Sequence, residues 1–439
     1  MSWQVYLALS LVMFFEYAVW GAWAPVLTAR LLGPLKMTGK QAGWIYATLP
    51  LACIFAPFVA GLAADRWVNA EWILIIAHLI GAVLLLAAAR AQRFGSLLPI
   101  MLCYSLCYAA TLPLVNSVLF AGTASIADEA ARGAAQAKVF IWAPIAWALT
   151  GWSLTGWRML RKTPGDGSDC LYLAAGLSIV MVLASALVAV LSPTPPSGGE
   201  AFPIQGVLEM LSQPNFLLFV VISMIVFGLM QFYFLGTAPF LQEKGIASKH
   251  VPGLMALAQI AQALATWFLF MKLIESLGFK WTLVIGAACW AALYGVYALG
   301  LARFWLASVQ PLHGLAYVFF VIVGQKFTND VSPEAIRSSM QALIFAATVG
   351  LGLFVGTQFA GFVMDHFSEE GKFQWRKVWL VPCGITVACV LIFAAAFQEP
   401  QPAGDQTAQG RPAASTNAVT VVRSSSSRGA TFGAEQAAR

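Results

Sequence analysis

Residues 14–23 read Phe-Phe-Glu-Tyr-Ala-Val-Trp-Gly-Ala-Trp, and they place one carboxylate, Glu16, in the middle of a long apolar run. The other Asp and Glu residues stand at the ends of such runs, between them, or in the C-terminal tail. Because a lone acid at membrane depth is costly, it usually binds a proton, a cation or a polar solute. This stretch therefore indicates a membrane-spanning carrier.

The composition agrees with a membrane protein. Sixty per cent of the residues are hydrophobic and only 10% are charged, whereas about a quarter are charged in soluble domains. Apolar runs of about twenty residues can each cross a ~30 Å hydrocarbon core as a helix, and they lack the alternation of barrel strands. We predict an all-α protein with about twelve transmembrane helices, at 5–30, 42–64, 71–92, 97–122, 137–158, 171–192, 214–241, 251–274, 280–300, 304–326, 338–364 and 377–397.

Charge and cysteine usage say little about further partners. The net charge of +6 comes from Lys and Arg residues spread over short loops and the tail, so no basic block predicts binding to nucleic acid. Cys103 and Cys107 are one helical turn apart, but no pair among the seven cysteines has the spacing of metal ligands. We expect no metal or other cofactor, and no segment indicates a protein partner besides the lipid bilayer.

An internal repeat divides the chain into two halves. The segment 129–136 (Glu-Ala-Ala-Arg-Gly-Ala-Ala-Gln) matches 334–341 (Glu-Ala-Ile-Arg-Ser-Ser-Met-Gln) at an offset of 205 residues. Two halves with the same direction across the membrane are typical of carriers built from parallel repeats. We predict an N-terminal six-helix bundle at 1–192, a Pro/Gly-rich loop at 193–212, a C-terminal six-helix bundle at 213–398 and a disordered tail at 399–439.

The loop between the second and third predicted helices carries a short motif. Residues 61–67 (Gly-Leu-Ala-Ala-Asp-Arg-Trp) resemble the signature loop of the major facilitator superfamily, whose Asp-Arg pair latches the cytoplasmic ends of helices. The further basic residues of that loop are replaced here by Val68-Asn69-Ala70. Ordinary interfacial charge is the alternative. Together with the arginines of the repeat, the motif predicts a conformational latch of Asp65, Arg66, Arg132 and Arg337.

A closer resemblance extends along most of residues 8–400. Residues 14–23, 61–67, 77–82, 112–117, 331–341 and 378–380 resemble the nucleoside:proton symporter family, the bacterial nucleoside permeases. The resemblance implies a multi-pass inner-membrane protein of the major facilitator fold, with two pseudo-symmetric bundles and both termini in the cytoplasm. With both termini in the cytoplasm, 14 of the 25 Lys and Arg residues fall in outer loops. Positive charge usually gathers in the cytoplasmic loops, so the charge distribution favours the opposite orientation. We let the resemblance decide the orientation.

The same resemblance implies a substrate site built from helices five, seven, eight and ten. Gln231 and Gln259 match that site, and Trp147 and Tyr317 stand where aromatic residues are expected. Other positions depart from the family. Where the family has a basic residue in helix five, this chain has Phe140. Where the family has acids in helices eight and ten, this chain has Gln262 and Val318.

The polar residues within the predicted helices form stripes. Glu16, Trp20 and Trp23 share one face, as do Gln259, Gln262 and Thr266, and likewise Gln310, His313 and Tyr317. Unpaired amides are costly in hydrocarbon, so each stripe should face the bundle interior or a wet cavity. We predict that the stripes converge on one central, water-accessible chamber shared by the two halves. The alternative is that the amides bond across helix contacts as structural glue. The predicted substrate-binding residues are Trp20, Asn116, Trp147, Gln231, Gln259, Gln262, His313 and Tyr317.

Such a pocket offers amides, an imidazole, a phenol and indole faces, without Lys or Arg at depth. It suits a neutral solute with a flat ring and several hydroxyls, and it does not suit a phosphate or carboxylate. We predict a secondary active transporter that moves a nucleoside-like solute by alternating access, coupled to protons. A carrier of a sugar or another neutral metabolite, either coupled or a uniporter, is the alternative. An intramembrane enzyme would need a catalytic cluster that the sequence lacks, and a sensing receptor would need a folded soluble domain.

Glu16 is the predicted proton-coupling group. Burial favours the neutral carboxyl, so substrate binding or helix movement could load and release a proton. His313 could share that proton. The alternative for Glu16 is a protonated side chain bonded to a neighbouring helix. We expect His78, in the third helix, to be a structural histidine.

Overall fold

The computed structural model describes residues 1–161, 165–196, 204–333 and 336–399, apart from the side chains of residues 129, 130, 337 and 338. Within this part of the chain, 12 helices are long and apolar enough to cross a membrane. The predicted number of spans is therefore confirmed. The predicted all-α fold is confirmed as well, because one short two-stranded hairpin, called the β-turn below, is the only sheet among the described residues.

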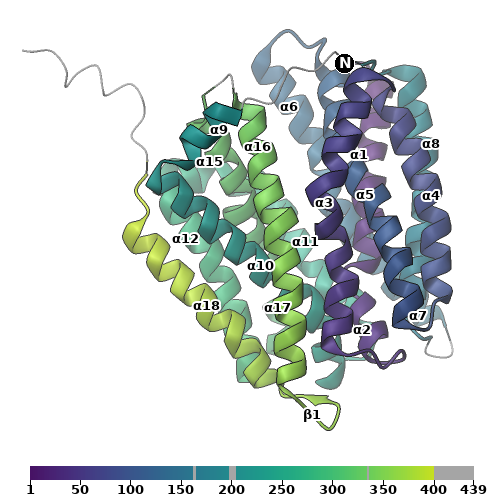
Figure 1. Ribbon diagram of the computed structural model, residues 1–439, viewed down its shortest axis with the longest axis vertical. Coiled ribbons are helices and arrows are strands. Elements are labelled where there is room, and N and C mark those ends of the chain that lie inside the picture. Colours follow the sequence, from purple (N-terminus) through teal and green to yellow (C-terminus); the bar gives the residue numbers. More distant parts are fainter. Residues whose placement is uncertain (162–164, 197–203, 334–335, 400–439) are drawn as a thin grey trace, which may run out of the picture. The chain divides into compact units, whose positions relative to one another are not determined.

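The first half begins at the N-terminus and supplies six of the spans (Figure 1). Its helices are α1 (Trp3–Trp23), α2 (Leu27–Leu32), α3 (Gly39–Arg66), α4 (Ala70–Arg90), α5 (Phe94–Thr123), α6 (Glu129–Phe140), α7 (Trp142–Leu160) and α8 (Asp169–Leu191).

The second half supplies the other six spans. Its elements are α9 (Ile204–Leu211), α10 (Pro214–Glu243), α11 (Val251–Phe268), α12 (Phe270–Leu299), α13 (Arg303–Ser308), α14 (Pro311–Ala316), the π-helix η1 (Tyr317–Ile322), α15 (Val323–Val331), α16 (Arg337–Phe345), the π-helix η3 (Ala346–Gly352), α17 (Leu353–His366), β1 (Ser368–Glu369), β2 (Lys372–Phe373) and α18 (Trp375–Ala396). Helix α9 lies inside the segment 193–212 that the sequence predicts as a loop, and the tail from residue 400 on lies outside the described residues.

Local signals explain where several helices begin. The Thr38 hydroxyl accepts from the Gln41 backbone N–H and the Gln41 side chain accepts from the Thr38 backbone N–H, which forms a capping box at the start of α3. The Asp128 carboxylate caps α6 by accepting from the Ala131 N–H at 2.7 Å. Such caps satisfy backbone donors that the first helical turn leaves unpaired.

A kink inside α12 falls at a glycine, where the sequence predicts the boundary between the eighth and ninth spans. Gly278 has a φ of 74° inside α12, a conformation that a residue with a side chain rarely adopts. The Phe279 N–H that follows donates to the Glu399 carboxylate at 2.7 Å, so this acid caps the helix after the break. The sequence places the boundary between residues 274 and 280, which brackets Gly278.

The internal repeat has a structural counterpart at two glutamines. The Gln136 amide in α6 donates to the Thr123 hydroxyl at the end of α5, at 3.0 Å. At the equivalent position, the Gln341 amide in α16 donates to the Gln325 carbonyl in α15, at 2.7 Å. Each glutamine ties the helix that enters one span to the end of the span before it.

The two halves meet along two pairs of helices. Within residues 1–399, α3 packs along α17 and α7 packs along α11. Figure 1 shows α3 and α17 side by side, with α2 and β1 at the end of the bundle opposite the N-terminus. We call this end, with the loops that follow α2, α7, α10 and α17, the closed end.

Candidate functional site

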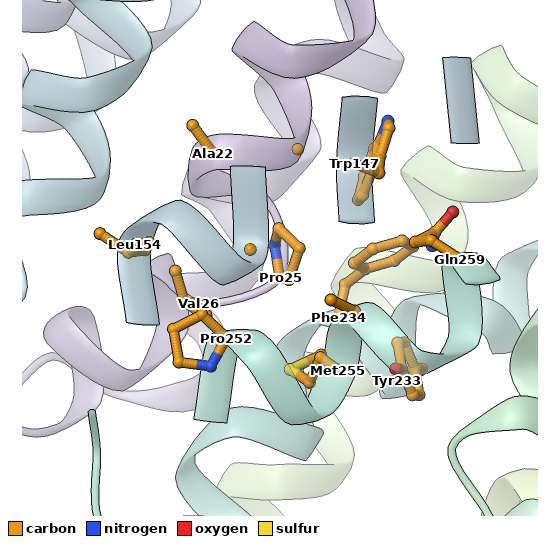
Figure 2. Close-up of a pocket in the computed structure, with 13 residues that line it drawn as sticks. Ala22, Pro25, Val26, Trp147, Leu154, Tyr233, Phe234, Pro252, Met255 and Gln259 are labelled. Atoms are coloured by element: carbon orange, nitrogen blue, oxygen red, sulfur yellow. The ribbon is translucent and has the colours of Figure 1, made fainter. Parts of the chain in front are cut away.

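A pocket lies where one helix pair from each half meets. Its walls come from α1 and its connection to α2, from α7, from α10 and from α11 (Figure 2). Carbon-rich side chains form most of the wall, and the polar groups are one phenol, one indole and one amide. The lining residues are Gly21, Ala22, Pro25, Val26, Trp147, Gly151, Leu154, Tyr233, Phe234, Pro252, Met255, Ala256 and Gln259.

Aromatic rings form one wall of this pocket. The Trp147 indole is edge-on to Trp20 with ring centroids 5.6 Å apart, and it is tilted by 56° against Phe234 at 6.1 Å. Figure 2 shows Phe234 and Gln259 next to each other below Trp147. Flat ligands stack on such rings, and an amide can both donate to and accept from hydroxyl groups.

The pocket is nearly shut in this conformation. About 20 Å³ is accessible to the centre of a water molecule, which is enough for roughly one water. Pockets that hold drug-sized ligands are typically ~300–1,000 Å³. Binding of a solute of several rings therefore requires the two halves to move apart.

Hydrogen bonds between the halves explain why the pocket is shut. The Thr28 hydroxyl of α2 donates to the Phe234 carbonyl of α10 at 3.0 Å. The Gly253 N–H of α11 donates to the Thr155 hydroxyl of α7 at 2.7 Å. Both hydrogen bonds lie at the closed end, so this end acts as one gate of the molecule.

An ion pair supports the same gate. The Arg158 guanidinium at the end of α7 donates to both Asp169 carboxylate oxygens at 2.7 and 2.8 Å, and it also donates to the Ser248 carbonyl of the second half at 3.2 Å. In the neighbouring loop, burial acts to raise the pKa of Asp166. Hydrogen bonds from Ser168 and the charge of Arg30 outweigh it, so that pKa is lower than usual.

Asp365 provides the most direct connection across the gate. Its carboxylate, at the end of α17, accepts from the Gly39 N–H and, at 2.8 Å, from the Lys40 N–H. These two donors are the first backbone groups of α3, so the acid caps a helix of the other half and faces the positive end of its dipole.

Asp365→Asn replaces one of the two accepting oxygens by an amide donor and removes the charge that faces the helix dipole, so it should weaken the gate by about 1–2 kcal/mol. This is roughly 5–30-fold in the closed-to-open ratio. The measurement is the labelling rate of Met255→Cys, a pocket position that is 3% exposed, by an impermeant maleimide in a background without native cysteines. The exposed acid of the β-turn supplies the matched control, Glu369→Gln. An unchanged labelling rate in Asp365→Asn would contradict the role of this contact.

Comparison with known proteins identifies the family. The family model described as nucleoside H+ symporter matches residues 3–402. The chain belongs to the nucleoside H+ symporter family. It is 25% identical to the nucleoside permease NupG of Escherichia coli over 425 residues, which cover 91% of this chain and 98% of that permease.

Two further comparisons agree with this membership. The xanthosine permease of Escherichia coli is 24% identical over 411 residues, covering 90% of this chain and 96% of the permease. The crystal structure of the nucleoside transporter NupG superposes with a TM-score of 0.77 at 23% identity, over 90% of this chain and 100% of the other. The predicted major facilitator fold is therefore confirmed.

The structure brings some of the predicted site residues of this family member together. Trp147 and Gln259 line the pocket, and Trp20 contacts Trp147. Gln231 and Gln262 are buried, at 5% and 9% exposed, on the two helices that form the second-half wall.

Three other predicted residues lie apart from the lining. Asn116 is in α5, where its Oδ1 atom is buried and has no hydrogen-bond partner among the described residues. Tyr317 begins the π-helix η1 and is partly buried. His313 stacks on Tyr233 with ring centroids 3.8 Å apart, so it lies behind a residue of the pocket wall.

One prediction about geometry is wrong. The polar stripes were expected to converge on a shared chamber, but the Glu16 carboxylate bonds to His78 within the first half. His313 accepts from the Trp290 indole N–H at 3.0 Å within the second half. Helical periodicity correctly groups residues on one face, but it does not say which neighbouring helix that face meets.

The predicted latch residues lie at the ends of helices. Asp65 and Arg66 are exposed at the end of α3, and neither side chain has a hydrogen bond or ion pair within the described part of the chain. Arg132 donates to the Ile126 carbonyl at 3.5 Å. Arg337 begins α16, and its side chain lies outside the described residues.

Sequence reasoning missed several residues of the site and its gate. Tyr233 and Phe234 line the pocket; Phe234 stands three positions after Gln231, a spacing that was a usable signal. The gate residues Asp365 and Thr28 gave no comparable signal, because an acid or hydroxyl near a span end is also typical of an ordinary interface.

Proposed function

We propose that this protein carries a nucleoside-like neutral solute across the inner membrane by alternating access, coupled to protons, with both termini in the cytoplasm. Membership of the nucleoside H+ symporter family supports the solute and the coupling. The pocket supports the same substrate class independently, because its lining combines aromatic rings and an amide and includes no Lys, Arg, Asp or Glu side chain.

The single observation that carries the proposal is the grouping of Trp147, Phe234 and Gln259 at the junction of the two halves. A nucleobase can stack on the indole and phenyl rings, which favour flat ligands. The Gln259 amide can exchange hydrogen bonds with the sugar hydroxyls or the base edge. Gln231 and Gln262, on the same helices as Phe234 and Gln259, are the next candidates for polar contacts once the pocket opens.

Alternating access would then consist of a rocking of residues 1–192 against residues 213–398. Opening of the closed end would break the contacts of Thr28, Thr155 and Asp365 with the other half. Asp65, Arg66, Arg132 and Arg337 remain our candidates for the latch at the opposite end. The segment 193–212, which contains α9, would connect the two moving bodies.

Proton coupling in this proposal rests on Glu16, which is completely buried. His313, the second candidate, is also buried and stacks on Tyr233 of the pocket wall. Either group could change its protonation when a solute enters or the halves move.

The test is a thermal-shift screen of the purified protein against nucleosides and, separately, against mono- and disaccharides. A ligand at about 100 times its Kd stabilises the folded state by ~2.7 kcal/mol, so a nucleoside that binds should raise the Tm by several degrees. Stabilisation by sugars alone would replace the proposed substrate by the alternative, a carrier of sugars.

A further inference from the structure

Glu16 lies at the centre of a polar cluster built by four helices of the first half. Its Oε2 atom is 2.8 Å from His78 Nε2 on α4, and its Oε1 atom accepts from the Thr111 hydroxyl on α5 at 2.7 Å. His78 Nδ1 is 3.3 Å from the Ser178 hydroxyl on α8. The Tyr108 hydroxyl donates to the Glu16 carbonyl at 2.7 Å.

The cluster is closed to solvent. Glu16 is 0% exposed and His78 is 2% exposed. An uncompensated charge in such a place costs several kcal/mol. A carboxyl and an imidazole in hydrogen-bond contact can hold one proton between them. With one shared proton the pair is neutral, and without it the pair carries a negative charge inside an apolar bundle.

Among the ionisable groups in the middle of these helices, the pair is the natural place for a proton. Its titratable neighbours are phenols, namely Tyr17 on α1 and Tyr104 and Tyr108 on α5. Tyr108 in turn lies near the Cys53 thiol on α3. Charged residues on the helices that pack against α1 and α4 stand toward the helix ends: Lys40, Asp65 and Arg66 on α3, Glu71 and Arg90 on α4, Arg132 and Lys138 on α6, Arg158 on α7 and Asp169 on α8.

A continuous line of contacts joins this cluster to the pocket. The Tyr108 ring, whose hydroxyl bonds to the Glu16 carbonyl, is edge-on to Trp20 at 6.2 Å. Trp20 in turn contacts Trp147 of the pocket wall at 5.6 Å. A solute that displaces the Trp147 ring therefore acts on the turn of α1 that carries Glu16.

We propose that Glu16 and His78 together form the proton-binding site of this carrier, with Thr111 and Ser178 as positioning residues. This inference rests on the proposed function and assigns its proton to a pair on α1 and α4 instead of to Glu16 alone. The binding site for the solute and that for the proton are then different sites, joined by Tyr108 and Trp20.

The proton step involves no other reactant. In the deprotonated pair the His78 Nε2–H donates to the Glu16 carboxylate. A proton from the water-accessible side then binds either to His78 Nδ1, which faces the Ser178 hydroxyl, or to a Glu16 carboxylate oxygen. The charge of the pair changes from −1 to zero. Release on the other side returns the proton to water and restores the negative charge, which the Thr111 hydroxyl stabilises from the α5 side.

The experiment compares two assays in proteoliposomes made with the full-length protein. Nucleoside counterflow needs no gradient, whereas net accumulation is driven by an imposed pH difference. For one-to-one coupling, one pH unit supports about tenfold accumulation. Glu16→Gln and His78→Gln should each reduce the accumulation ratio to about one while counterflow continues. The double variant should be no worse than either single variant, because residues that act as a unit are not additive.

Two exposed residues supply matched controls. Glu369→Gln in the β-turn and His250→Gln before α11 make the same chemical changes outside the cluster, and both should keep the tenfold accumulation. If His78→Gln kept full accumulation, His78 would not belong to the proton site. The proposed pair would then be overturned, whatever the accumulation measured for Glu16→Gln. Absence of nucleoside counterflow in the unmodified protein would instead reject the proposed function.

A milder variant keeps the test valid if a polar substitution in the cluster disturbs folding. Thr111→Val removes the hydroxyl that donates to Glu16 but keeps the shape of the side chain. Because that donor favours the charged carboxylate, its loss should move the midpoint of proton-driven uptake to higher pH. A purely structural cluster would lower the Tm of this variant and leave the midpoint unchanged, which would overturn the inference.

Discussion

Gly314→Ala should greatly reduce the amount of folded carrier and abolish its transport. Gly314 in α14 packs directly on α11, where an added Cβ would overlap the Ala258 carbonyl and lie 2.7 Å from the Gln262 backbone nitrogen. Backbone atoms cannot rotate away as a side chain can, so the two helices would have to separate. Overpacking usually costs ~1–3 kcal/mol and occasionally more, and we expect the upper end of that range. The measurement is the Tm of the detergent-purified protein together with nucleoside counterflow.

The same substitution at an open position is the control. Gly176 in α8 has no atom within 4 Å of an added Cβ. Because alanine favours a helix over glycine by roughly 1 kcal/mol, Gly176→Ala should match or exceed the Tm of the unmodified protein. If Gly314→Ala were as stable as Gly176→Ala, the close packing of α14 on α11 would be wrong.

Trp147→Ala should weaken nucleoside binding by about ten- to a hundredfold. Stacking of a base on an aromatic side chain contributes ~1–3 kcal/mol, and each 1.4 kcal/mol corresponds to about tenfold in Kd. Trp147 also packs on the glycine of α1, since an added Cβ on Gly21 would lie 3.0 Å from the indole. The substitution therefore removes both the stacking surface and the packing that holds it. Equilibrium binding of a radiolabelled nucleoside measures the effect.

Two variants separate stacking from general damage. Trp147→Phe keeps a ring and should retain most of the affinity. Trp72→Ala removes an indole that is 53% exposed on α4 and should leave Kd unchanged. If Trp147→Ala and Trp72→Ala bound equally well, the aromatic wall would have no part in recognition.

The sequence was sufficient for the twelve spans and for the family. A run of about twenty apolar residues has few structural alternatives in a bilayer, so even the ends of the spans were close. Gly278 is an example, because its φ of 74° lies within the predicted gap between two spans. The repeat was also visible, and it placed Gln136 and Gln341 at positions where the structure gives them the same role.

The direction of polar side chains was harder to predict. Glu16 and Trp23 share a helical face, and that face meets α4 and α5 inside the first half. Whether a face points to a cavity or to a neighbouring helix depends on how the helices pack, which no local pattern records. The contact with His78 was nevertheless accessible to reasoning, because a buried acid requires a partner and His78 is the one histidine of the first half.

The most direct test of the central claim is nucleoside exchange by the purified protein in proteoliposomes, measured as counterflow of a radiolabelled nucleoside. The claim is that a nucleoside binds where Trp147, Phe234 and Gln259 meet. We predict saturable exchange that unlabelled nucleosides compete for and sugars do not, with a much higher half-saturating concentration in Trp147→Ala. Exchange of sugars without exchange of nucleosides, or nucleoside exchange with identical kinetics in Trp147→Ala, would contradict it.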